Sequence, residues 1–241
     1  MTSNLVLHCG GERATRVEVE AIPVPRQTDS WRPVSYADAI GLMHETIADR
    51  LKLPIVKEAY GLNAEGLQLF ALFTLDTGNP EHGLSIGLRQ SYNKSLALGV
   101  AVGAQVFVCD NLAFRGDAFE VVRKNTVNVW RDFRAMVEKQ AARSLEHYAN
   151  LENDVKRMKA APCDLTRGYE LLGTAYGQGL LTTKQATIAF EDWKEPRHED
   201  FADRNLWGFY NATTEALKKG TVANVIDRHA AMHGFVMAQA A

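Results

Sequence analysis

Apolar residues form short runs in the first half of the chain and recur at helical spacing in the second half. Four runs predict β-strands: Ile55–Leu62, Leu67–Leu75, Leu84–Leu88 and Leu96–Cys109. Turn-forming residues separate the first three, so an antiparallel meander is the simplest arrangement. The small and β-branched residues of the fourth run are typical of a strand that is buried on both faces.

Helical spacing first appears after Ser35, which is a good N-cap for a helix over Tyr36–Leu51. After the strands, apolar residues recur every three or four positions from Asp117 to about Lys159, which predicts one helix of roughly 40 residues, or ~60 Å. The stripe consists of Val127, Trp130, Phe133, Val137, Ala141, Leu145, Tyr148, Leu151, Val155 and Met158. A helix this long outruns its sheet, so another helix or another subunit must cover part of the stripe.

Shorter elements flank this core. Ahead of it, Leu5–Cys9 and Arg16–Ile22 predict a β-hairpin. Behind it, the pattern predicts helices over Leu165–Tyr176, Lys184–Trp193, Leu206–Lys218 and Val222–Gln239. The fold class is therefore α+β, with an antiparallel sheet of four or more strands, a very long helix and a C-terminal helical region. We expect a hairpin and linker over 1–34, an α+β core over 35–160 and helices over 161–241.

Composition places the chain among ordinary globular proteins. Hydrophobic residues make up 46% of the 241 residues, charged residues make up 23%, and the net charge is −2. No run approaches the ~20 apolar residues that a membrane span needs. Cys9, Cys109 and Cys163 lie far apart without a CxxC motif, which favours a reduced, cytoplasmic protein.

Signatures of known chemistry are missing from the sequence. Neither GxxxxGK[ST] nor a strand-linked GxGxxG occurs, and there is no GxSxG. His229 and His233 lie four residues apart on a predicted helix and could share a metal ion, but no third ligand is evident nearby. We therefore expect no metal and no other cofactor, and the residues give no positive support for an enzyme.

Basic and polar residues near the strands are more suggestive. If the strands and the long helix fold together, these side chains can line a cationic groove with an aromatic platform, which suits a phosphate backbone and stacked bases. The candidate nucleic-acid-binding residues are Arg89, Tyr92, Asn93, Lys94, Asn111, Arg115, Arg123, Lys124 and Arg131. The alternative is that the cations form the solvated face of an amphipathic helix, balanced by Asp117, Glu120 and Asp132. The helical aromatics Trp130, Phe133, Trp207, Phe209 and Tyr210 are expected in the core.

Three stretches carry a resemblance to a known family: Gly87–Leu96, Gly103–Phe114 and Asn205–Lys218. They are similar to the core motifs of the phage- and plasmid-encoded proteins grouped as "domain of unknown function 932", over roughly 35–218. Gln90 and Asn93 depart from the Asn and Asp that the family pattern has there. The resemblance implies a mobile-element protein that acts in a bacterial cytoplasm, but it names neither a reaction nor catalytic residues.

The predicted order of a helix, a strand meander and a long helix also resembles that of the Rad-type and phage single-strand annealing proteins. This topological analogy implies an oligomer that binds DNA in a cationic groove. The leading hypothesis is thus a phage-type protein that binds or anneals single-stranded DNA as a homo-oligomer, without cofactor or membrane. The alternatives are a protein-interaction or structural factor that does not bind nucleic acid, and a small-ligand binder or enzyme that uses the polar loop around Asn93 and Asn111.

Overall fold

The computed structural model describes residues 12–107, 111–122, 125–218 and 225–240. Six strands form one antiparallel sheet whose spatial order follows the sequence, which confirms the predicted meander and the α+β fold class. The strands are β1 (Glu12–Ala14), β2 (Ile55–Leu62), β3 (Gln68–Leu75), β4 (His82–Ser91), β5 (Leu98–Val106) and β6 (Leu112–Val122).

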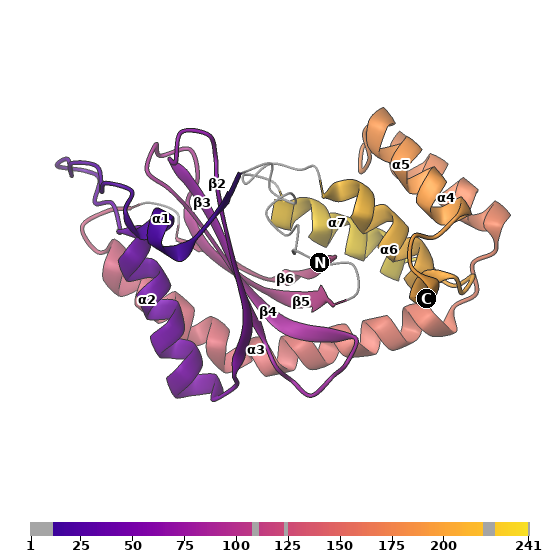
Figure 1. Cartoon of the computed structure of the whole chain (residues 1–241), viewed down its shortest axis with the longest axis horizontal. Helices are drawn as coiled ribbons and strands as arrows, with labels where there is room; N and C mark the ends of the chain where they lie inside the picture. Colours follow the sequence, from indigo (N-terminus) through magenta and orange to yellow (C-terminus); the bar gives the residue numbers. More distant parts are fainter. Residues whose placement is uncertain (1–11, 108–110, 123–124, 219–224, 241) are drawn as a thin grey trace.

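The two faces of the sheet differ in composition. The helix face, with residues such as Tyr60, Phe73, Leu88 and Val100, is buried in the main hydrophobic core. Helices α2 (Tyr36–Thr46) and α3 (Val129–Ala160) pack on this side, and a π-helical turn, η2 (Ile47–Leu51), continues α2 (Figure 1). The opposite face contains little side-chain volume in β2, β4 and β5. We call it the glycine face because Gly61, Gly83, Gly87, Gly99 and Gly103 lie on it.

After α3, the described residues form four α-helices: α4 (Leu165–Gly177), α5 (Thr183–Lys194), α6 (Leu206–Leu217) and α7 (Val225–Met237). Helices α6 and α7 pack against α3, and α7 also runs along β6 (Figure 1). The buried imidazole Nε2 of His233 in α7 lies 3.0 Å from the carboxylate of Asp154 in α3. Helices of the same chain therefore cover the part of α3 that extends past the sheet.

The predicted strand over Arg16–Ile22 is wrong, because Arg16–Glu20 forms a short helix, α1. The alternation of Val17 and Val19 with charged residues mimics a strand. Thr15 decides the outcome: its hydroxyl accepts from the amide of Glu18, whose carboxylate accepts in return from the amide of Thr15 at 2.7 Å. This capping box satisfies two amides that a helix start leaves open. The other predicted hairpin strand, Leu5–Cys9, lies outside the described residues.

The long helix begins at Val129 rather than at Asp117, because Leu112–Val122 pairs with β5 as an additional strand. Its buried stripe also differs from the predicted one. Val127, Trp130 and Leu145 are exposed, whereas polar residues, including Gln140, Ser144 and His147, occupy buried positions on α3. The remaining predicted helices agree with α4, α5 and α6, while α7 is described from Val225 onward.

The turn between β3 and β4 is fixed to α3 by polar contacts. The hydroxyl of Tyr148 lies 2.9 Å from the Thr77 hydroxyl and donates to the carbonyl of His82 at 2.9 Å. Asn79 donates to the carboxylate of Glu152 in the next turn of α3. Burial lowers the pKa of His82, because the charged imidazolium is poorly solvated there. This network holds one end of the β3–β4 hairpin against the helix.

Over the described part of the chain, no helix combines the length and the apolar character that a membrane span requires.

Candidate nucleic-acid interface

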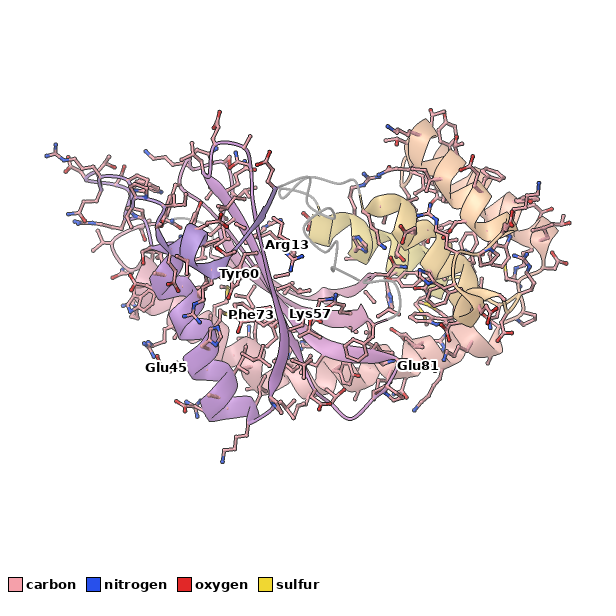
Figure 2. The ribbon with its side chains drawn as sticks, in the orientation of Figure 1. Arg13, Glu45, Lys57, Tyr60, Phe73 and Glu81 are labelled. Atoms are coloured by element: carbon pink, nitrogen blue, oxygen red, sulfur yellow. The ribbon has the colours of Figure 1, made fainter. Side chains whose placement is uncertain are left out.

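A cross-strand row of the glycine face places two arginines on either side of an aromatic residue. Arg13 pairs with Gly61, Gly61 with Phe70, Phe70 with Arg89, and Arg89 with Gly99. Directly paired residues of antiparallel strands project from the same face, so all five belong to the glycine face. Figure 2 shows Arg13 on the side of the sheet that faces α7, and Tyr60 and Phe73 on the side of α2.

The Phe70 ring lies beside Gly87 of the neighbouring strand. A Cβ atom at Gly87 would lie 3.5 Å from the Phe70 ring and 3.8 Å from a methyl of Leu72, which are ordinary van der Waals contacts. The place of Phe70 therefore does not require a glycine at position 87. In the structure Phe70 is buried, so this ring is not available to a ligand in the conformation described.

Arg89, the first of the predicted site residues, faces α7. Its guanidinium lies 3.5 Å from the carboxylate of Asp227, in the first turn of that helix. The Arg89 side chain is 11% exposed, whereas the Asp227 side chain is 60% exposed. Arg89 is thus a nearly buried cation in contact with a carboxylate that is mostly exposed to solvent.

The turn from β4 to β5 is held by several hydrogen bonds. The amide of Leu96 donates to the Ser91 hydroxyl at 2.9 Å, and the amide of Ser95 donates to the side chain of Asn93 at 3.1 Å. Gln68 of β3 donates to the Ser95 hydroxyl at 2.8 Å. These bonds hold Lys94 at a φ of 64°, in the left-handed region that a lysine rarely adopts.

Lys94 projects from this turn over an aromatic ring. Its ammonium lies 4.9 Å from the centroid of the Trp31 indole, within the range of a cation–π interaction. Asn93, Lys94 and Ser95 are exposed, and Trp31 is half-buried. The turn therefore exposes a cation and hydrogen-bonding groups to solvent, and the half-buried indole of Trp31 lies beneath the cation.

The linker that carries Trp31 also contacts the segment leading into α3, because the amide of Arg32 donates to the carbonyl of Asn125 at 2.7 Å. A second pair follows on the first turns of α3, where the guanidinium of Arg134 lies 5.8 Å from the Trp130 ring. Arg134 is paired with Glu45 of α2 at 3.1 Å.

Arg131, a predicted site residue, is also exposed on the first turn of α3. Its guanidinium donates to the carboxylate of Asp132 at 3.0 Å. Trp130 is 39% exposed, which corrects its predicted place in the core, whereas Phe133, Trp207, Phe209 and Tyr210 are buried as predicted.

Tyr92 does not serve as the predicted stacking platform for a base. Its buried ring stacks on Tyr36 with centroids 3.9 Å apart and an interplanar angle of 4°. Its hydroxyl accepts from the amide of Tyr36 at 2.8 Å, in the first turn of α2. Tyr92 therefore caps the start of α2, because its hydroxyl accepts a hydrogen bond from a backbone amide that has no partner within the helix.

Asn111 is likewise structural rather than open to a ligand. It is buried, and its amide donates to the side chain of Asn211 in α6 at 3.1 Å. Asn93 and Asn111 flank opposite ends of β5, which spans Leu98–Val106. At about 3.3 Å per residue, this strand holds them too far apart to share a small-ligand pocket.

Arg115 lies within β6 at an irregularity of the sheet. Phe119 pairs with Ala101 and Phe114 pairs with Gly103, so β6 inserts extra residues between these two pairs. The side chain of Arg115 lies outside the part of the chain that the structure describes, as do Arg123 and Lys124.

The single groove expected between the strands and the long helix is not formed by Arg89 and Arg131. Arg89 lies on the glycine face, whereas α3, which carries Arg131, packs on the helix face, where core residues fill the space. The reason is the register, which places Arg89 opposite Phe70 and not toward α3.

We call the remaining candidate set the cationic track. Arg13, Gln68 and Arg89 lie on the glycine face, and Asn93, Lys94 and Trp31 lie at the turn from β4 to β5. Sequence analysis missed Arg13, Gln68 and Trp31. Trp31 has a local signal, since it is a tryptophan in a proline-rich polar linker, whereas Arg13 and Gln68 join the track only through strand pairing.

Among the described residues, His, Cys, Asp and Glu side chains form no group of three that could hold a metal ion. Comparison with protein-family models, with curated proteins and with solved structures finds no match for this chain. The family resemblance and the topological analogy therefore stay predictions, and the functional argument depends on the residues alone.

Proposed function

We propose that this protein binds single-stranded nucleic acid through the cationic track, as a phage-type DNA-binding or annealing protein that acts as a homo-oligomer in a bacterial cytoplasm. The observation that carries the proposal is the exposed turn in which Lys94 lies over the half-buried indole of Trp31. An aromatic face beside a cation suits a base and its phosphate, and every base has a face that can stack.

The surroundings of the pair support this function. Asn93 and Ser95 offer hydrogen-bonding groups on the same turn, and Arg89 and Arg13 continue the positive charge along the glycine face. A duplex presents its bases edge-on within grooves, so a side chain such as Trp31 can stack only on an unpaired base. We therefore expect a preference for single strands over duplexes.

The test is fluorescence anisotropy with labelled single- and double-stranded oligonucleotides at low and moderate salt. Lys94→Ala should weaken binding and reduce the slope of log affinity against log salt by about 0.7, the value for one phosphate contact on a single strand. Trp31→Ala should remove a stacking contact worth about 1–3 kcal/mol. Lys184→Ala, which removes an exposed lysine on α5, is the matched control and should leave binding unchanged.

Two results would contradict the proposal. Well-folded wild-type protein without salt-sensitive binding would reject nucleic acid as the ligand. Equal effects of Lys94→Ala and Lys184→Ala would show that binding depends only on general charge. Light scattering on the same samples gives the oligomeric state.

A different surface favours a second candidate function, that of a protein-interaction factor. The hairpin of α4 and α5 lies far from the sheet (Figure 1) and exposes Leu165, Tyr176 and Phe190, with Phe190 5.2 Å from Tyr169. Exposed aromatic residues of this kind are enriched in protein interfaces. Stable association without affinity for nucleic acid, abolished by Phe190→Asp, would favour this function over the first.

A further inference from the structure

Asp227 is an anion in contact with Arg89, a residue of the cationic track. Its carboxylate contacts Arg89 at 3.5 Å from the first turn of α7, and Arg89 belongs to the same cross-strand row as Arg13. A carboxylate and a phosphate offer a guanidinium the same chemistry, namely anionic oxygens that accept its N–H groups. The contact therefore joins the C-terminal helix to the central cation of the track.

The exposures of the two side chains indicate that this pairing can be exchanged. Asp227 is 60% exposed, so water can solvate its carboxylate when Arg89 turns to another partner. Its place in the first turn of α7 also favours a negative charge, because the helix dipole is positive there. Arg89 is only 11% exposed, and a phosphate that reaches it can bind its guanidinium through two parallel hydrogen bonds.

We propose that Asp227 is an autoinhibitory residue that occupies Arg89 in the absence of ligand and is displaced by a nucleic-acid phosphate. This inference depends on the proposed nucleic-acid function of the cationic track. Because a phosphate replaces Asp227 at Arg89, the contact between β4 and α7 must break when nucleic acid binds. Any change that lifts the first turn of α7 from the sheet would then raise the affinity for nucleic acid.

The test compares Asp227→Asn with wild-type protein in the anisotropy assay. The variant should bind a single-stranded oligonucleotide roughly fivefold more tightly at low salt, because no carboxylate has to be displaced from Arg89. The salt slope should stay the same, since Arg89 contacts one phosphate in the complex of either protein. Glu170→Gln on α4 is the matched control, because it removes one exposed negative charge outside the track. The gain should vanish in the double variant Arg89→Ala/Asp227→Asn, which shows that Asp227 acts through Arg89.

Each other outcome overturns the inference. Wild-type binding without a gain in Asp227→Asn, or with an equal gain in Glu170→Gln, rejects the autoinhibitory contact while leaving the proposed function intact. A gain that persists without Arg89 assigns Asp227 only a general repulsion. Absence of binding by both wild-type protein and Asp227→Asn rejects the inference together with the proposed function, and circular dichroism confirms that each variant is folded.

Discussion

Among the glycines whose surroundings the structure describes, Gly168 in α4 is the one where an added methyl group would clash most severely. A Cβ atom there would lie 2.0 Å from Nε1 of Trp193 and 2.4 Å from its Cε2. Trp193 is fully buried, with Phe209 5.7 Å from its ring on one side and the guanidinium of Arg204 4.7 Å away on another. The indole therefore cannot withdraw without disturbing α5 and α6.

Two opposing effects decide the stability of Gly168→Ala. Alanine is favoured over glycine in a helix by about 1 kcal/mol. Overpacking of a closed core costs about 1–3 kcal/mol, and more where the clash is severe. Because the contact is far shorter than van der Waals distance, we expect the upper end, so that the variant is about 2 kcal/mol less stable than wild type.

Gly173, on the same helix, provides the control, because no atom lies within 4 Å of its added Cβ. Gly173→Ala should gain up to about 1 kcal/mol from helix propensity alone. Urea unfolding followed by far-ultraviolet circular dichroism gives the free energy of unfolding of both variants. Equal stability of the two variants would contradict this prediction. The loss of stability caused by Gly168→Ala should also shrink in a Trp193→Phe background, and an unchanged loss there would contradict the prediction as well.

Three further predictions concern single contacts. Tyr92→Phe should lower the free energy of unfolding by about 1–3 kcal/mol in urea titrations, because it leaves the amide of Tyr36 buried without its acceptor. Asp164→Ala should cost about 1 kcal/mol by thermal unfolding, since Asp164 accepts from the amide of Arg167 at 2.8 Å as the N-cap of α4, and Asp164→Ser should recover most of it. The pKa of His82 is lowered below 6.5 in the folded chain. The stability that the neutral His82 contributes is therefore present above pH 6.5 and is lost as the pH falls below it. The urea midpoints at pH 7.5 and 5.5 should differ less in His82→Gln than in wild type.

Local patterns predicted most of the fold. Ser35 caps α2 as expected, and the turn-forming residues between β2, β3 and β4 predict the meander. The failures arise where two local signals compete. In Arg16–Glu20 the strand-like alternation gives way to the capping box of Thr15 and Glu18, because a helix this short depends on its cap.

Nonlocal pairing explains the other error in the fold. Residues 112–122 contain no proline and could continue the helical pattern of α3, but they pair with β5 along one edge of the sheet instead. The residue spacing within 112–129 does not reveal this nonlocal pairing. The strand ends at Val122, and the helix begins at Val129.

The candidate site was less predictable than the fold because its members come from separate strands and a linker. Arg89, Asn93 and Lys94 are neighbours in sequence and were found. Tyr92, between them, points into the core because one residue of register reverses the face of a strand. Arg13 enters the row of Arg89 only through the pairings of Gly61 and Phe70.

The internal pairing of the cations determines which of them can contribute most to binding a polyanion in a chain with a net charge of −2. Arg89, Arg131 and Arg134 each contact a carboxylate within the chain, so a phosphate that binds them must first replace an anion. Lys94 differs, because within the described residues its ammonium lies over an indole and forms no ion pair with a carboxylate. Replacing an indole contact frees no opposing charge, so Lys94 should contribute more to the binding energy than any of these three arginines. Alanine variants ranked by affinity in the same oligonucleotide assay test this order, and a larger loss for Arg131→Ala than for Lys94→Ala would move the interface to the start of α3.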